Sequence, residues 1–165
     1  MKIKVRKAEI TDIESILDIV NHEIANTTVI YDYAQRTLEE QLVWFEDKVK
    51  QGFPVIVATK DGKVVGFGTY GFFRTKEAYK KTIEHSIYIA KDVRGFGIGH
   101  VLMEKLIQLA VDEGYHVMIG VIDASNIGSV EFHERFGFTV AGKFKEVGYK
   151  FDRWLDIFYM QKMLN

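Results

Sequence analysis

The sequence contains no cysteine, which excludes a disulfide framework and a thiol nucleophile. This composition is typical of proteins in a reducing cytoplasm. No apolar run approaches the roughly 18 residues that a membrane-spanning helix needs. The alternating stretch from Met1 to Arg6 is not followed by the apolar core of a signal peptide. We therefore expect a cytoplasmic protein with no membrane partner.

An excess of one charge and a metal-ligand pattern are also missing. The formal net charge is −1 at pH 7, so the chain as a whole has no attraction for nucleic acid. The histidines show no spacing typical of a metal site, and they are His22, His85, His100, His116 and His133. We expect neither a nucleic-acid partner nor a bound metal.

The residues that are abundant indicate a packed globule. Hydrophobic residues make up 47% and aromatic residues 13% of the 165 residues, which favours a folded chain over a disordered one. This length suits one domain, and the sequence shows no linker, internal repeat or low-complexity segment. It therefore predicts a single domain over residues 1–165.

Hydrophobic periodicity predicts elements in the order βααβββαβαββ, an α/β (α+β) fold with a mixed sheet. Capping boxes at Thr11 with Glu14 and at Thr37 with Glu40 each open a helix with a repeating apolar face. The single proline, Pro54, lies just before a strand, where the missing N–H donor does no harm. Strands are predicted at 3–8, 55–59, 64–73, 82–90, 116–123, 138–146 and 154–164, and further helices at 100–113 and 125–136.

The glycine-rich run Arg94–Gly99 separates a predicted strand from an amphipathic helix. Glycines let the backbone approach a ligand closely, and the first N–H groups of the helix are free, at the positive end of its dipole. We therefore predict a phosphate cradle. Two other interpretations stay open at this point. The glycines also suit a plain tight turn, or a dinucleotide fingerprint in which Asp123 binds the ribose, although His100 is bulky where that fingerprint needs a small residue.

The spacing of Arg94, Gly97 and Gly99 resembles the coenzyme A pyrophosphate loop of the GNAT N-acetyltransferases. Three further segments resemble the phosphinothricin and methionine sulfoximine acetyltransferases of that family: Asn21–Ile24 with Thr28 and Tyr31, Ala78–Tyr88, and Gly148–Lys150 with Trp154 and Asp156. The resemblance covers the full length. It implies a GNAT fold, acetyl-CoA as co-substrate, and a homodimer that acetylates the α-amine of a small amino acid or analogue.

Site residues for the coenzyme follow from the same resemblance. In the family, the strand that corresponds to residues 82–90 parts from its neighbour and frees backbone groups to bind the thioester and the pantetheine arm. This predicts that coenzyme contacts come from that strand, the glycine loop and the start of the short helix: Ile87, Tyr88, Ile89, Arg94, Gly95, Phe96, Gly97, Ile98, Gly99 and Asn126. Locally, Asn126 is equally typical of a helix N-cap.

Two side chains are predicted to be catalytic. Amide formation from a thioester needs a neutral amine and a proton for the departing thiolate. Glu84 points away from its apolar neighbours on the strand, and the family resemblance makes it the base; otherwise it is an ordinary solvent-facing carboxylate. His133 stands where many GNAT enzymes have a tyrosine that is the usual candidate acid, so the resemblance predicts that His133 protonates the departing thiolate. A purely structural role as a partly buried helix histidine is equally compatible with the sequence.

The acceptor site is predicted from basic and aromatic residues that match the subgroup. Arg74 and Lys76 suit the carboxylate of an amino acid, although both also suit a solvated loop. Aromatic walls are expected from Tyr31, Tyr79 and Trp154, partly from a neighbouring subunit.

Rival functions differ in acceptor or in class. A protein N-terminus would need an open groove, and a polyamine would favour an acidic pocket over Arg74 and Lys76. A non-catalytic acyl-CoA-binding module would not need Glu84. A nicotinamide-binding fragment is disfavoured by His100.

Overall fold

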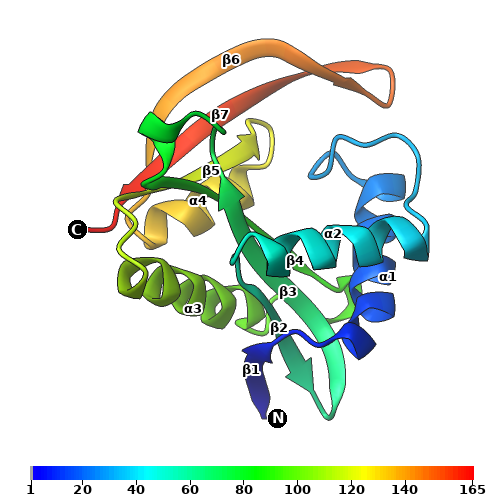
Figure 1. Ribbon diagram of the computed structural model, residues 1–165. Helices are drawn as coiled ribbons and strands as arrows, with labels where there is room; N and C mark the ends of the chain where they lie inside the picture. Colours follow the sequence, from blue (N-terminus) through cyan, green and yellow to red (C-terminus); the bar gives the residue numbers. More distant parts are fainter. Residues whose placement is uncertain (1) are drawn as a thin grey trace.

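The computed structural model describes residues 2–165 as one seven-stranded sheet with helices on both faces (Figure 1). The strands are β1 (Ile3–Lys7), β2 (Val55–Lys60), β3 (Lys63–Phe72), β4 (Thr82–Ile89), β5 (Val117–Asp123), β6 (Thr139–Lys150) and β7 (Arg153–Met163). The helices are α1 (Ile13–Asn26), α2 (Leu38–Lys50), α3 (Ile98–Asp112) and α4 (Ile127–Arg135), with short 3-10 turns η1 (Ile10–Asp12), η2 (Glu77–Tyr79) and η3 (Lys91–Val93).

The predicted order of strands and α-helices is confirmed, and the differences lie at element ends. The capping box predicted at Thr11 is wrong: Glu9 and Asp12 form it instead, so a 3-10 turn precedes α1. The box at Thr37 with Glu40 is confirmed. The last hairpin is longer than predicted, because β6 continues through a register irregularity to Lys150.

The sheet order is β1-β2-β3-β4-β5-β7-β6. Strands β1 to β4 pair antiparallel, β4 and β5 pair parallel, and β7 then pairs antiparallel with both β5 and β6. The β2–β3 hairpin closes at Asp61 and Gly62, both with positive φ (50° and 80°), as expected of a tight Asp-Gly turn. Among the strands within residues 2–165, only β4 and β5 pair in parallel, and α3 provides the crossover between them.

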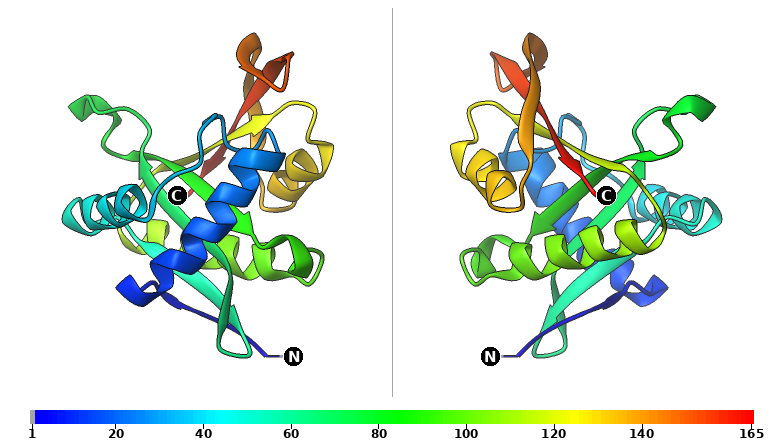
Figure 2. Two further views of the ribbon diagram at one scale, coloured as in Figure 1. Left: turned by 90° about the vertical axis from the view of Figure 1, so that its right-hand side faces the viewer. Right: turned by 90° about the vertical axis from the view of Figure 1, so that its left-hand side faces the viewer.

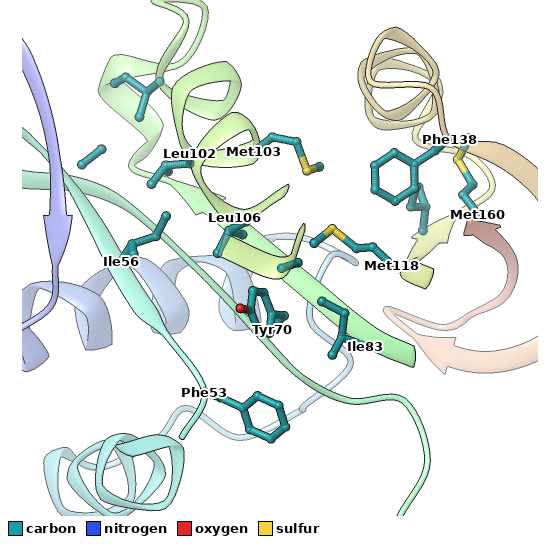
Figure 3. Packing of buried hydrophobic residues seen from close by; sticks show 14 of the residues in the cluster. Phe53, Ile56, Tyr70, Ile83, Leu102, Met103, Leu106, Met118, Phe138 and Met160 are labelled. Carbon is teal, nitrogen blue, oxygen red and sulfur yellow. The ribbon is translucent and has the colours of Figure 1, made fainter. Parts of the chain in front are cut away.

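Two hydrophobic cores lie on opposite faces of the sheet. On one face, α1 and α2 cover residues such as Val57 and Phe67. On the other, α3 and α4 pack over Ile83 and its neighbours; Figure 3 shows Leu102, Met103 and Leu106 of α3 pointing into this cluster. Figure 2 shows the long β6–β7 hairpin projecting away from the helices. Side chains of β4 alternate between these two faces.

The apolar pattern of α2 accounts for only part of its orientation. Leu42 and Phe45 pack against the core on this face of the sheet, whereas Leu38 and Val49, which repeat at the same helical spacing, are exposed, Val49 by 62%. The side chain of α2 that is fully buried is polar, namely Gln41. A helix that turns polar residues inward is not oriented by hydrophobic burial alone.

Within residues 2–165, no helix has the length and apolar character to cross a membrane. The described part of the chain also contains no group of three or more His, Cys, Asp or Glu side chains placed to hold a metal ion.

Candidate active site

Strands β4 and β5 part near the middle of the sheet. They pair only at Thr82–Glu84 and Val117–Ile119, although β4 continues to Ile89 and β5 to Asp123. Each strand keeps its other neighbour throughout, so β3 and β7 hold the two arms in place. Backbone N–H and C=O groups along the facing edges therefore lack a strand partner and can bind an extended ligand. The segment Ile87–Ile89 lies on this open edge.

The glycine loop stands at the N-terminus of α3. Gly95 and Gly97 have positive φ, 85° and 77°, and a Cβ at either position would meet no atom within 4 Å. Gly97 is the N-cap residue, and no side chain caps the helix. The N–H groups of the first turn are therefore available to an anion. The loop is suited to a pyrophosphate group, whose binding there stays a prediction, and the positive φ at Gly95 and Gly97 explains why glycine is favoured at both positions.

Arg94 is engaged away from this cradle. Its guanidinium donates to Glu23, a residue of α1 that is only 3% exposed, and Nε lies 3.4 Å from the carbonyl oxygen of Ile89. Glu23 also accepts from Thr27 Oγ1 at 2.9 Å. The arginine therefore ties the glycine loop to α1, while the loop backbone stays open to a ligand. A coenzyme contact through the Arg94 side chain remains a prediction.

Glu84 lies where the two strands part, as the last β4 residue paired with β5. It shares the α2 face with Gly71, its partner on β3. Desolvation by burial raises the pKa of its carboxyl group, and the positive charges of Arg74 and Lys48 oppose that rise. A half-buried carboxylate with a raised pKa suits proton abstraction from an ammonium group better than an exposed one. Its catalytic role stays a prediction.

His85 and His133 form a buried pair beside the same point, on the opposite face of the sheet. Their Nε2 atoms are 3.0 Å apart, and His133 Nδ1 donates to the carbonyl oxygen of Ser129 at 2.6 Å. A Cβ on Gly120 would lie 3.1 Å from His85 and 3.2 Å from His133, so glycine is needed where the strands separate. Burial lowers the pKa of both rings. His133 is therefore a neutral side chain whose Nδ1 proton is committed to the backbone.

Asn126 and Asp123 have local hydrogen-bonding roles. The Asn126 side chain accepts from the Ser129 N–H at 3.1 Å, which confirms the N-cap. Its contact with the coenzyme remains a prediction. Asp123 accepts from the N–H and Oγ of Ser125 and from Thr28 Oγ1. The carboxylate that resembled a ribose ligand thus joins β5 to the segment between α1 and α2.

The β3–β4 connection carries three of the predicted acceptor residues. Arg74, Lys76 and Tyr79 are exposed, and Tyr79 is 43% accessible. Phe73 holds this segment on the sheet, since its ring packs edge-on against Tyr79 (5.9 Å between centroids) and against Tyr159 of β7 (6.3 Å). Arg74 stacks over the Phe73 ring and acts electrostatically on Glu84. The structure therefore connects Arg74 with the predicted base.

Tyr31 and Trp154 lie on opposite faces of the β6–β7 hairpin. Tyr31 packs against Gly148, where a Cβ would approach its ring to 2.8 Å. Gly148 pairs with the buried Leu155, whereas Trp154 belongs to the next pair and is 62% exposed. Because successive residues of a strand face opposite sides, Trp154 cannot join Tyr31 in one wall within a subunit.

Sequence reasoning missed two polar residues of this region. Lys48 stands in an ordinary helix C-terminal turn, and nothing in the pattern distinguishes it from Lys50. His85 alternates with Ile83 and Ile87, so a histidine on an apolar face was its only signal. Its partner lies 48 residues further along the chain, a separation that no local pattern reveals.

Comparison with protein-family models matches residues 16–138 to the acetyltransferase (GNAT) family. An L-methionine sulfoximine/L-methionine sulfone acetyltransferase of Pseudomonas aeruginosa is 39% identical over 100% of this chain and 96% of its own. A phosphinothricin N-acetyltransferase of Streptomyces viridochromogenes is 30% identical over 97% of this chain and 87% of its own.

Solved structures give the same answer. An N-acetyltransferase from Staphylococcus aureus is 42% identical with a TM-score of 0.99 over 100% of both chains. A ribosomal-protein-alanine N-acetyltransferase from Brucella melitensis is 40% identical with a TM-score of 0.96 over 97% of this chain and 99% of its own. A phosphinothricin acetyltransferase from Sinorhizobium meliloti, in complex with acetyl-CoA, is 32% identical with a TM-score of 0.96 over 100% of this chain and 90% of its own. The parted strands, the glycine loop and these similarities agree, and the chain belongs to the GNAT family of acetyl-CoA-dependent N-acetyltransferases.

Proposed function

We propose that this enzyme transfers acetyl from acetyl-CoA to the α-amine of a small amino acid or analogue, with methionine sulfone, methionine sulfoximine and phosphinothricin as the best candidates. The observation that carries this proposal is Glu84, a half-buried carboxylate with a raised pKa at the point where β4 leaves β5. Arg74 supplies a positive charge beside it, which suits an acceptor carboxylate. The names of the relatives support the same acceptor class.

The chemistry that follows is direct attack in a ternary complex. Glu84 takes a proton from the ammonium group, directly or through water, and frees the nitrogen lone pair. The nitrogen bonds to the thioester carbonyl carbon and gives up a second proton. The carbon–sulfur bond breaks as the amide forms, and coenzyme A leaves as a thiolate that takes up one proton. Backbone N–H groups on the open edge, such as that of Ile87, would stabilise the negative charge on the acetyl oxygen. These backbone donors make a special side chain unnecessary.

His133 remains the predicted source of a proton for the thiolate, and its hydrogen bonds limit which ring nitrogen can supply that proton. The Nδ1 proton is donated to Ser129. Any proton that His133 delivers must therefore come from the Nε2 side, where His85 is the neighbour. We propose that His85 and His133 act together in supplying this proton.

Homodimerisation is part of the proposal. Strand β6 lies at an edge of the sheet and carries exposed apolar side chains, which suits an interface between two copies. They are Val140, Phe144, Val147 and Tyr149, with Trp154 on β7. A partner subunit would also bring the outward-facing Trp154 within reach of an acceptor site. A single domain over residues 1–165 and a cytoplasmic location stay predictions.

The test is coenzyme A thiol release with purified enzyme and a panel of amines: the three candidates, common amino acids, a polyamine and a peptide N-terminus. We expect turnover with the candidates and a loss of at least about a hundredfold in Glu84→Gln, the typical contribution of a general base. Full activity of Glu84→Gln would contradict the assignment of the base. Binding of acetyl-CoA without turnover of any amine would favour a non-catalytic module.

A protein N-terminus is the second candidate acceptor. The Brucella melitensis structure named as a ribosomal-protein-alanine N-acetyltransferase supports it at 40% identity. Turnover confined to a peptide N-terminus would establish this alternative. Turnover of a polyamine would contradict both, because Arg74 and Lys76 would repel a polycation.

A further inference from the structure

Lys48 of α2 lies on the same face of the sheet as the predicted base, Glu84. Its Nζ donates to the Tyr70 carbonyl oxygen at 2.9 Å and lies 5.5 Å from the centre of the Phe53 ring. A Cβ on Gly71 would be only 2.7 Å from Nζ, so the ammonium occupies the space that any other residue at position 71 would fill. Glycine at this position therefore makes room for the lysine.

This location places a positive charge close to Glu84. Gly71 and Glu84 are direct cross-strand partners, and the Cβ positions of such a pair are about 4.5–5.5 Å apart on the same face. Lys48 and Glu84 form no direct ion pair among residues 2–165, so the carboxylate stays free for an acceptor ammonium. The lysine thus acts across space without occupying the base.

The orientation of α2 supports a functional position for Lys48. Gln41 and Lys48 are seven residues apart, two helical turns, and therefore share a face. That face points at the sheet, while Val49 is 62% exposed. The helix half-buries a lysine ammonium, at a cost in desolvation, and exposes the valine next to it, which favours a use for the charge.

We propose that Lys48 is a positioning residue whose ammonium keeps the Glu84 carboxylate ionised in its half-buried site. The inference rests on the proposed function, in which Glu84 is the base. Desolvation favours the protonated carboxyl group, which cannot accept a proton, and a nearby cation opposes this effect. Arg74 acts in the same direction from the β3–β4 connection. The nearest neighbours of Glu84 on β3 and β5, Gly71 and Ile119, carry no titratable group.

Lys48→Met removes the charge and keeps most of the side-chain volume. An opposite charge at this range typically lowers a carboxyl pKa by about one unit or more, so the acid limb of kcat/KM should move up by about one pH unit. On the acid limb, where the Glu84 carboxyl group is mostly protonated in both proteins, activity should fall about tenfold. Burial lowers the pKa of Lys48 to about 8, so wild type and variant should converge above that pH.

Two further variants make the test specific. Gly71→Ala should displace the flexible end of Lys48 and shift the limb in the same direction with the lysine still present. Lys50→Met, the same substitution at an exposed position of the same helix, should leave the limb in place. Lys48→Arg should restore most of the wild-type profile. A fall in thermal stability without any movement of the limb would show that Lys48 is merely structural and would overturn the proposal.

A direct titration separates this inference from the proposed function. The Glu84 carboxyl carbon, identified by its absence in Glu84→Gln, can be followed by carbon-13 NMR without any substrate. We expect its midpoint to rise by about one pH unit in Lys48→Met. An unchanged midpoint would refute the Lys48 proposal even with an active enzyme. A shifted midpoint in a protein without transferase activity would instead contradict the proposed function alone.

Discussion

His85 of β4 donates its Nε2 proton to His133 of α4, because the only proton of neutral His133 is already donated to Ser129. In that tautomer His85 Nδ1 carries no proton, and it has no hydrogen-bond partner among the described residues. Both rings pack against Phe138. The Ser129 carbonyl thus fixes the tautomer of His133, which in turn fixes that of His85, and the pair joins α4 to the sheet beside the parted strands.

Replacing both histidines should cost less than the sum of the two single replacements. His85→Leu leaves the buried Nε2 of His133 without a donor, which typically costs about 1–3 kcal/mol. The double variant His85→Leu/His133→Phe has no orphaned nitrogen, so its loss should be smaller than the sum of the single losses. Urea unfolding of the four proteins gives the coupling energy. Strict additivity would show that the two rings do not depend on each other.

The same pair should make the fold sensitive to acid. The pKa of both histidines is lowered from 6.5 in the folded protein, so below that pH the unfolded chain binds protons that the folded chain does not. The stabilisation is present above pH 6.5 and is lost as the pH falls further. Urea unfolding of wild type and of His85→Leu/His133→Phe at several pH values should give a flatter curve below pH 6.5 for the variant. Parallel curves would rule out the pair as the source.

Glu23→Gln should weaken acetyl-CoA binding. The substitution keeps the size of the side chain and removes the charge that ties Arg94 to α1. The arginine is about half exposed, and pairs of this kind contribute up to about 1 kcal/mol, or about fivefold in Kd. Calorimetric titration with acetyl-CoA measures this change. Tighter binding would mean that Arg94 itself contacts phosphate once Glu23 releases it.

Gly97→Ala should lower affinity for acetyl-CoA through the backbone alone. A Cβ there has open space, but φ is 77°, where an L side chain costs about 1–2 kcal/mol. Gly52 is a matched control, since it has the same φ of 77° and open space but follows α2. Both variants should lose stability, and Gly97→Ala should also lose coenzyme affinity. Equal Kd values for wild type and Gly97→Ala would show that the loop conformation does not contribute to acetyl-CoA binding.

Gly148→Ala should impair the acceptor site. Its Cβ would lie 2.8 Å from the Tyr31 ring and displace that side chain. We expect KM for the amine to rise several-fold while KM for acetyl-CoA stays unchanged. Gly142→Ala on the same strand meets no atom within 4 Å and serves as control. An unchanged KM for the amine would show that Tyr31 is not part of the acceptor pocket.

The element order could be predicted because each element carries a local signal, such as the Asp61-Gly62 turn or the capping box at Thr37. Residues joined only by tertiary structure could not be predicted. Lys48 lies near Glu84 only because of the placement of α2. His85 contacts His133, which lies 48 residues further along the chain. The capping error at Thr11 shows the reverse limit: a local motif was present, and Glu9 with Asp12 formed a competing one.

The brief contact between β4 and β5 divides the sheet into a four-stranded and a three-stranded part that meet through three residue pairs. A molecule lying in that gap completes the sheet, and it can do so only when the chain is folded. By mass action, such a molecule raises the free energy of unfolding as its concentration rises. The lifetime of this enzyme against proteolysis is therefore expected to follow the cellular supply of acetyl-CoA, so that the protein persists longest when its co-substrate is plentiful.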